Sequence, residues 1–279
     1  MKAFPRESPS RKRITAMTLL LAGLLAAPPG CAKKPKEQKA APPPERLYQM
    51  AIEKMAKGHY YAARTLLQQI LPRIPPEDRD LLPRVQLAIA DSYFNDKGAL
   101  NYGEALNGYR NFLTYFPNHE KADHAQFMVG MSLFRQVLAP DRDQAQTLKA
   151  IAEFRKVETG YPGSPYVEQA RRQIDLCLDL LADHERLIGW FYQRRKVWPA
   201  AVDRYTAILD RYPNYHHMNQ VLFDLGWCNL NLGNRLSGEA YFGQLWHNDP
   251  DGKLSAKARG ILEKYDRDQE ERRRKESGG

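Results

Sequence analysis

The sequence predicts an all-α fold, an α-solenoid of about five helical pairs that follow one another along the chain. Apolar residues recur with the 3.6-residue period of an amphipathic helix through most of residues 45–264, and alternating strand-like stretches are scarce. A helix-breaking proline also closes five similar segments, at spacings of 42, 45, 51 and 37 residues. Recurrence on this scale is typical of solenoids. The closing prolines are Pro75, Pro117, Pro162, Pro213 and Pro250.

The first thirty residues have the pattern of an export signal. Five Lys and Arg residues precede an apolar run of fourteen residues, Ile14 to Ala27. A helix of that length spans about 21 Å, short of the ~30 Å hydrocarbon core of a bilayer, so it suits a secretory signal. A basic start, a short apolar core and then Cys31 resemble a bacterial lipoprotein signal, in which the cysteine becomes the acylated first residue.

We therefore assign residues 1–30 to a lipoprotein signal peptide and Cys31 to lipidation. Gly30 fits the usual lipoprotein box, whereas Pro28 and Pro29 depart from it. The alternative is ordinary signal-peptide cleavage near Ala27, which leaves Cys31 as a free thiol. Pro28 directly after that cut would hinder it.

The segment after the signal reads as a tether. Residues 31–44 would form the acylated cysteine and a flexible linker. Their aliphatic residues are no larger than Ala, so burial of side chains cannot offset the entropy lost on ordering the chain. Residues 1–30 and 32–44 together carry +7 of the net charge of +9, the body 45–264 carries +2, and the charged tail 265–279 is neutral. Nucleic acid is not an expected partner, since duplex binding needs a clustered cationic footprint.

The body divides into five units, expected at residues 45–76, 82–118, 122–163, 182–214 and 219–251. In each second helix a small residue lies twelve positions, and a large residue eight positions, before the closing proline. These pairs are Ala63/Leu67, Ala105/Tyr109, Ala150/Phe154, Ala201/Tyr205 and Gly238/Phe242. In the first helices Ala51, Gly189 and Gly226 lie 24 before their prolines.

This pattern resembles the tetratricopeptide repeat, which implies a right-handed solenoid. Two helices approach closely where one side chain is small, and the large residue fills the space beside it. Units two and three hold extra residues, around 95–101 and 136–146.

Cys177 and Cys228 lie among apolar neighbours and are expected to be buried. The aromatic clusters at 60–61 and 190–192 are expected to pack in the core and the groove.

A lipoprotein signal, a short tether and five such repeats together resemble the BamD family, lipoproteins of the β-barrel assembly machinery in the Gram-negative outer membrane. The most specific stretches are DRDQAQTLKAIAEFRKVETGYPGSPYVEQARRQIDLCLDLLADHE and FYQRRKVWPAAVDRYTAILDRYPN. The first contains the pattern FxxVxxxYPxSxY after a stretched third unit. The resemblance covers roughly residues 14–250.

The resemblance implies a lipid-anchored scaffold on the periplasmic face of the outer membrane. Its C-terminal repeats would dock the periplasmic domains of the barrel insertase, and its N-terminal repeats would receive unfolded outer-membrane proteins. Other lipoproteins of the assembly complex are further expected partners. Arg204 matches a family position associated with insertase coupling, which makes it a candidate for a partner carboxylate. The alternative for Arg204 is an exposed, solubilising side chain.

A substrate groove is expected on the first helices of units one and two. The motif projects three residues of the first unit and four of the second onto it: Tyr48, Ile52, Met55, Arg84, Leu87, Asp91 and Phe94. Apolar side chains with one Arg suit an extended peptide that ends in a carboxylate. The alternative for about half of these residues is packing between repeats.

The sequence contains none of the motifs that would indicate an enzyme with a bound cofactor or metal. GxGxxG, GxxxxGK[ST], HExxH and CxxC are absent. No segment outside the repeats is large enough for a catalytic domain, so we expect no catalytic residue. The alternative function is another periplasmic tetratricopeptide adaptor lipoprotein, either a cell-envelope division coordinator or a pilus-secretin pilotin. The former typically carry an N-terminal coiled coil, and the latter have more regular units.

Overall fold

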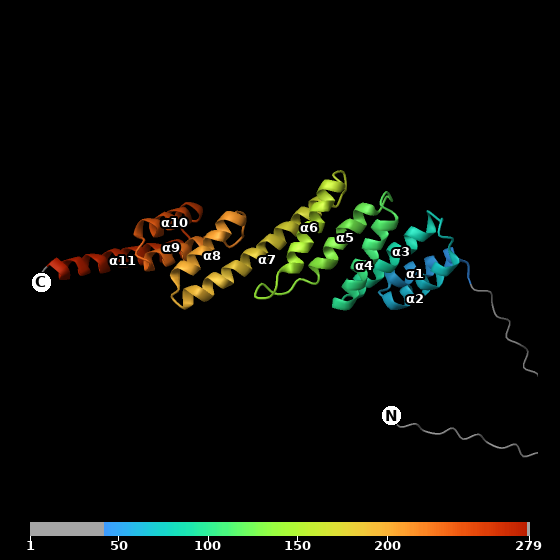
Figure 1. Cartoon of the computed structure of the whole chain (residues 1–279), viewed down its shortest axis with the longest axis horizontal. Helices are drawn as coiled ribbons and strands as arrows, with labels where there is room; N and C mark the ends of the chain where they lie inside the picture. The colour runs from blue at the N-terminus through green and yellow to red at the C-terminus, as the bar shows by residue number, and fades with distance from the viewer. Residues whose placement is uncertain (1–41, 278–279) are drawn as a thin grey trace, which may run out of the picture. The chain divides into compact units, whose positions relative to one another are not determined.

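The computed structural model describes residues 42–277, and this part of the chain is built from α-helices and one short 3₁₀ helix, with no strand (Figure 1). None of its helices is both long and apolar enough to cross a membrane. Cys31 and most of the predicted tether lie outside the described residues. The helices are α1 (Pro44–Ala56), α2 (Tyr60–Ile70), η1 (Leu71–Arg73), α3 (Leu81–Asp96), α4 (Ala99–Tyr115), α5 (Ala122–Phe134), α6 (Ala145–Gly160), α7 (Val167–Arg194), α8 (Trp198–Arg211), α9 (Met218–Asn231), α10 (Arg235–Asn248) and α11 (Lys253–Ser277).

Each helix from α1 to α10 packs mainly on the helices before and after it in the sequence. Contacts that skip a helix join α1 to α3 and α9 to α11. Short connections make sequential helices antiparallel neighbours, and a chain of such pairs buries a continuous apolar seam that no single pair can bury. The predicted all-α solenoid of helical pairs is therefore confirmed.

Small residues allow the close crossings between paired helices. A Cβ atom built on Gly226 of α9 would lie 2.3 Å from the ring of Phe242 on α10. A Cβ atom on Gly189 of α7 would lie 2.6 Å from the ring of Tyr205 on α8. The large residues predicted for the second helices are all fully buried: Leu67, Tyr109, Phe154, Tyr205 and Phe242. Each large ring or side chain therefore fills the space that its small neighbour leaves.

Gly130 on α5 and Ala90 on α3 are first-helix small residues that the fixed spacing did not predict. A Cβ atom on Gly130 of α5 would lie 2.6 Å from the ring of Phe154, and one on Gly108 of α4 would lie 2.9 Å from Cβ of Ala90 on α3. In these units the small residue of the first helix lies more than 24 residues before the closing proline, because the extra residues lie between that small residue and the proline. In unit two the extra residues lengthen α4, and in unit three they form the connection 135–144.

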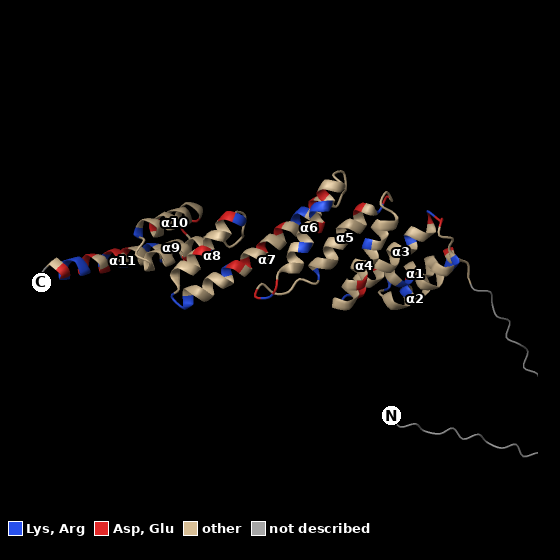
Figure 2. Ribbon diagram, in the orientation of Figure 1, with Lys and Arg blue, Asp and Glu red and all other residues tan. Residues whose placement is uncertain are grey.

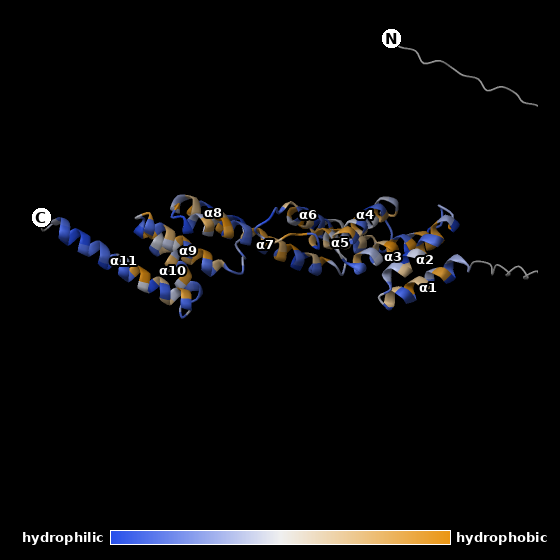
Figure 3. Ribbon diagram, turned by 90° about the horizontal axis from the view of Figure 1, so that it is seen from below, coloured by the Kyte–Doolittle hydropathy of each residue, from blue (hydrophilic) through white to orange (hydrophobic). Residues whose placement is uncertain are grey.

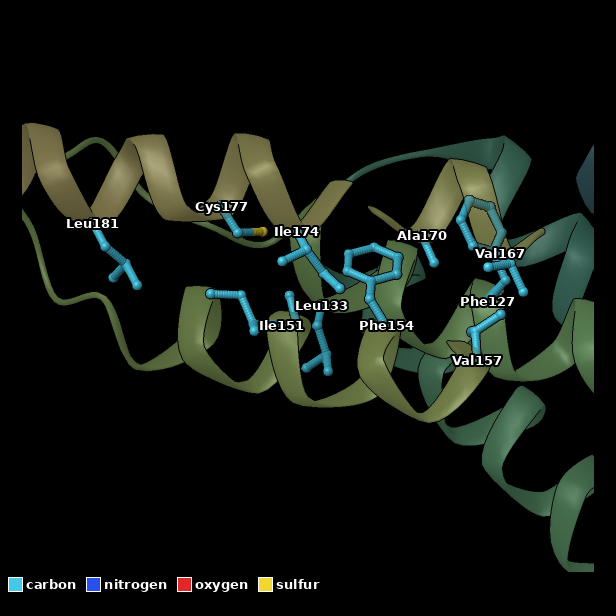
Figure 4. Close-up of a cluster of buried hydrophobic side chains, with 11 residues drawn as sticks. Phe127, Leu133, Ile151, Phe154, Val157, Val167, Ala170, Ile174, Cys177 and Leu181 are labelled. Carbon is cyan, nitrogen blue, oxygen red and sulfur yellow. The ribbon is translucent and has the colours of Figure 1, made fainter. Parts of the chain in front are cut away.

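Helix α7 belongs to two helical pairs. Its N-terminal half packs on α6, where Ile174, Cys177 and Leu181 meet the apolar face that includes Phe154 (Figure 4). Its C-terminal half pairs with α8 through Ala182. The fourth unit was expected to contain only residues 182–214. No proline interrupts the chain between Pro165 and Pro199, so one continuous helix forms and joins two apolar clusters.

The turn between paired helices requires a left-handed backbone. Gly58 and Gly233 lie at this position with φ of 75° and 81°, each seven residues after the small residue of the first helix. Lys196 lies seven residues after Gly189 with φ of 61°. A Cβ atom is strained at such φ values, whereas glycine is not. We expect Lys196→Gly to raise the free energy of unfolding by about 0.5–1 kcal/mol, measured by urea denaturation. A loss of stability would contradict this backbone assignment.

The last helix changes character along its length. Its first half packs on α9 and α10 through Leu254, Ala258 and Ile261, and Figure 3 shows its hydrophobic colour giving way to hydrophilic toward the C-terminus. Both signs of charge mix on its second half (Figure 2). Arg235 of α10 holds Asp266 with two hydrogen bonds of 2.7 and 2.9 Å. The predicted tail 265–279 thus continues α11 as a helix as far as Ser277.

Candidate functional site

The structure places the predicted groove residues on two helices that contact each other. Tyr48, Ile52 and Met55 lie on α1, and the other four lie on α3. Ile52 is exposed, and the other six are half-buried. We call this surface the α1–α3 face. Its residues differ in what they touch, and those contacts decide which side chains are available to a partner.

Arg84 already binds carboxylates of its own chain. Its guanidinium contacts Glu45 on α1 at 3.3 and 3.4 Å and donates to Asp80 at 2.9 Å. It also lies 5.1 Å from the ring centre of Tyr48. Glu45 is half-exposed, so this ion pair is in contact with solvent and contributes little to stability. A peptide carboxylate at this point would compete with Glu45 for Arg84.

The remaining α3 residues divide between polar and apolar packing. Asp91 accepts a hydrogen bond of 2.7 Å from the Tyr109 hydroxyl and lies 3.4 Å from Nε2 of His124. Burial, followed by the charge of Asp91, raises the pKa of Tyr109. Leu87 and Phe94 pack against the buried cluster that contains Tyr109. These three residues help to hold α3, α4 and α5 together, whichever partner the face binds.

Arg204 has a carboxylate partner within the chain. Its Nη1 atom donates to Oε2 of Glu185 on α7 at 3.0 Å. Glu185 is only 13% exposed, whereas the Arg204 side chain is 43% exposed. The guanidinium therefore joins α8 to α7 and still turns part of its surface to solvent. The sequence alone does not indicate this pairing, since the two residues are 19 positions apart on different helices.

A hollow lies on the first helices of the C-terminal repeats, beside the aromatic cluster 190–192 that was expected to pack in the core and the groove. It has a volume of about 600 Å³ and lies between α7, α9 and α11. We call it the α7–α9–α11 hollow. Its lining consists of Arg186, Trp190, Gln193, Gln220, Phe223, Asp224, Trp227, Lys257 and Ile261. Only the packing of all three helices brings these residues together, because they come from positions up to 75 residues apart.

A buried carboxyl lies in the wall of this hollow. Asp224 is 7% exposed and accepts hydrogen bonds from the amides of Gln220, at 3.0 Å, and Gln193, at 3.4 Å. Burial raises the pKa of Asp224. The hydrogen bonds from the two amides and the positive charges of Arg186 and Lys257 act in the opposite direction without cancelling this rise. Gln193 also accepts a hydrogen bond from the Tyr205 hydroxyl at 2.5 Å. The Gln193 amide is therefore held in place from both sides.

The raised pKa of Asp224 has a consequence for stability against pH. The folded chain holds this proton more tightly than the unfolded chain, so stability falls as pH rises from about 3.9, the ordinary value, through the folded pKa. We expect Asp224→Asn to increase the free energy of unfolding at pH 7. The gain should shrink toward pH 4, as measured by urea denaturation at several pH values. A variant that is equally destabilised at both pH values would contradict this account.

The two expected aromatic clusters divide between packing and the exposed surface, and Tyr192 packs against a buried cluster. Tyr61 is 76% exposed and Phe191 is 48% exposed, so neither packs in the core. The Cζ atom of Arg195 lies 3.7 Å from the ring centre of Phe191. These side chains point away from the apolar seam because the small-residue positions, not the aromatics beside them, face the paired helix. Trp190 does line the α7–α9–α11 hollow.

The polar and sulfur-containing groups of the described residues show no arrangement for a metal. No group of three His, Cys, Asp or Glu residues in this part of the chain is placed to hold an ion. Cys177 and Cys228 are free and fully buried, as the sequence predicted. Burial raises the pKa of each thiol to about 12, so both remain protonated at neutral pH.

Stacked helical pairs that follow one another along the chain define it as a helical-repeat protein. A model of the YfiO family, described as outer membrane lipoprotein, matches residues 40–239. The chain belongs to this family.

Its relatives include two proteins named outer membrane protein assembly factor BamD. One, from Caulobacter vibrioides, is 28% identical over 80% of this chain and 72% of that protein. The other, from Rickettsia prowazekii, is 27% identical over 88% of this chain and 96% of that protein. Among solved structures, the TPR2AB-domain:pHSP90 complex of yeast Sti1 aligns over 80% of this chain and 85% of that chain, with 13% identity and a TM-score of 0.42.

Proposed function

We propose that this chain is a lipid-anchored scaffold for the assembly of outer-membrane β-barrel proteins and that it acts by binding, without catalysis. The observation that supports this most is the family match over residues 40–239, together with relatives named outer membrane protein assembly factors. A body made of helical pairs suits the role, since such pairs offer long faces to extended segments and to folded partners.

The proposed anchor is a lipid on Cys31, which would hold the body at the periplasmic face of the outer membrane through the tether. We expect radiolabelled palmitate to be incorporated by the full chain and not by Cys31→Ser. Incorporation that survives this substitution would overturn the assignment.

In this proposal the α1–α3 face receives unfolded outer-membrane proteins. A peptide carboxylate would replace Glu45 on Arg84, while the exposed Ile52 and the edge of Tyr48 contact apolar side chains. Arg84→Gln is expected to weaken the binding of a peptide from the C-terminus of a barrel protein by about tenfold, because a charge-assisted hydrogen bond is lost. Fluorescence anisotropy with a labelled peptide measures this change.

A matched pair of variants sharpens the test. Arg46→Gln removes an exposed cation from the same region and should leave the affinity unchanged. Glu45→Gln removes the competing carboxylate and should strengthen binding. If Arg84→Gln and Phe94→Ala both bind the peptide as tightly as the unmodified chain, the α1–α3 face is not the receiving site.

The C-terminal repeats, about residues 185–250, would dock the periplasmic domains of the barrel insertase, with other assembly lipoproteins in the same complex. Arg204 is the proposed contact, since its half-exposed guanidinium keeps donors free beside Glu185. We expect Arg204→Gln to reduce the insertase captured from outer membranes several-fold. Glu185→Gln breaks the same internal ion pair but frees Arg204, so capture should persist. Equal losses in both variants would assign Arg204 to the helix packing alone.

A further inference from the structure

Three adjacent cations lie where α7 turns into α8, and no acidic side chain of the described residues pairs with them. Arg194, Arg195 and Lys196 are all exposed, and none of them makes an ion pair within residues 42–277. The chain has no Asp or Glu between Glu185 and Asp203. In Figure 2 this turn carries the blue of Lys and Arg. The turn therefore presents uncompensated positive charge to solvent.

Exposed apolar side chains flank these cations. Trp190, Phe191 and Val197 each leave close to half of their surface in solvent. The guanidinium of Arg194 lies over the ring of Trp190, with Cζ 4.7 Å from the ring centre, and that of Arg195 lies over the ring of Phe191. A positive charge and an exposed ring therefore stand side by side twice on one surface. Such a surface can bind anionic and apolar groups together.

The segment 190–198, which we call the α7–α8 tip, is held in shape from behind. Tyr192 and Trp198 pack against the buried cluster that contains Tyr205. The backbone N–H groups of residues 195–197 donate to the carbonyl oxygens of residues 192 and 193 at 3.0 Å. The backbone of the tip is therefore already ordered, and it loses little conformational entropy when it binds a partner.

The chemistry of the tip favours a lipid surface over an acidic protein. Phe191, Val197 and the three cations stand outside the α7–α9–α11 hollow, at the outer end of a helical pair (Figure 1). A carboxylate alone would leave Phe191 and Val197 without an apolar partner. Aromatic rings beside Lys and Arg are typical of the boundary between water and bilayer, where the rings lie among the headgroups and the cations reach phosphates. The chain also belongs to a family of outer membrane lipoproteins, which places a bilayer nearby.

We propose that the α7–α8 tip docks on the anionic headgroups of a phospholipid bilayer. The three cations bind headgroup phosphates, and Phe191 and Val197 enter the boundary between headgroups and acyl chains. Because the charges are exposed, the contact weakens as the salt concentration rises. This docking rests on the proposed function only for a location at a membrane, and it requires neither the acyl group on Cys31 nor a contact by Arg204.

A fluorescent probe on the tip measures this contact in the full chain. Val197→Cys is labelled with nitrobenzoxadiazole, and the buried Cys177 and Cys228 do not react. The unmodified chain is labelled in parallel, and the signal of any probe that it takes up at Cys31 is subtracted. The chain is mixed into vesicles of phosphatidylethanolamine with phosphatidylglycerol, or of phosphatidylcholine alone. We expect the emission to shift to the blue and to rise several-fold in the anionic vesicles only, and to revert in concentrated salt. The same emission in both kinds of vesicle would overturn the proposal.

Matched variants of the labelled chain locate the contact. Arg194→Gln, Arg195→Gln and Lys196→Gln together should remove the shift, since each cation contributes about fivefold to binding at an anionic leaflet. These side chains are exposed, so their loss spares the core. The control removes an equal charge from the exposed end of α11 and should leave the shift unchanged. It carries Arg272→Gln, Arg273→Gln and Arg274→Gln. If both triple variants keep the shift, or both lose it, the cations of the tip are not the lipid contact.

Two further measurements separate lipid docking from the proposed function. Flotation with phosphatidylcholine vesicles depends on the acyl group at Cys31 and not on the tip, so its failure counts against the anchor alone. The barrel insertase is also reconstituted beside the labelled chain, and we expect the shift in anionic vesicles to be the same with and without it. A shift that requires the insertase would assign the tip to a protein contact and contradict docking on lipid.

Discussion

Replacing Gly226 by alanine should lower the free energy of unfolding by about 2–3 kcal/mol, because the added methyl group overpacks the crossing of α9 and α10. Its Cβ atom would lie 2.3 Å from the ring of Phe242, closer than two carbon atoms can approach. Phe242 is fully buried and cannot swing into solvent. Urea denaturation followed by circular dichroism measures the change.

The chain contains a matched control for this substitution. Gly243 lies in the interior of α10, and a Cβ atom there would have no neighbour within 4 Å. Gly243→Ala should therefore stabilise the protein by up to about 1 kcal/mol through helix propensity alone. Adding Phe242→Leu to Gly226→Ala should recover part of the lost stability. If Gly226→Ala were as stable as Gly243→Ala, the close crossing of this pair would be refuted.

Replacing Phe154 by alanine should cost about 3–5 kcal/mol, the usual cost of a large cavity in a packed core. Its ring is fully buried and packs beside Gly130 on α5 and against the N-terminal half of α7 (Figure 4). Because α7 also carries Ala182 and Gly189 of the next pair, damage at Phe154 should destabilise both apolar clusters. A thermal scan should show one transition at a lower midpoint.

Leu148 lies on the same helix as Phe154 and is 57% exposed. Leu148→Ala should change stability by no more than about 0.5 kcal/mol. If Phe154→Ala split the thermal unfolding into two transitions, with the second at its original midpoint, then α7 would not couple the two clusters.

The repeated pairs of small and large residues explain why the fold was predictable from sequence. In each second helix a small residue and a large one four positions on, such as Gly238 and Phe242, leave a pattern that a fixed spacing from the closing proline detects. The same spacing missed Gly130 and Ala90, since extra residues separate them from the closing proline. The length of α7 follows from the absence of proline, but its membership of two pairs depends on what its N-terminal and C-terminal halves pack against.

The site was less predictable because its contacts join distant positions. The sequence placed Tyr48 and Arg84 on one face, yet it showed neither that Glu45 already occupies Arg84 nor that Glu185 pairs with Arg204. The α7–α9–α11 hollow gathers residues from three helices, and the sequence singled out only Trp190 among them, within the aromatic cluster 190–192. Charge and exposure in such a place depend on how the helices are stacked.

Capture from detergent-solubilised outer membranes tests the proposed scaffold most directly. The full chain, carrying an affinity tag, is recovered from cells, and the proteins that accompany it are identified by mass spectrometry. The account predicts that the barrel insertase is recovered with the unmodified chain and with Glu185→Gln, and is reduced several-fold with Arg204→Gln. Absence of the insertase from the unmodified sample would contradict the proposed role in barrel assembly.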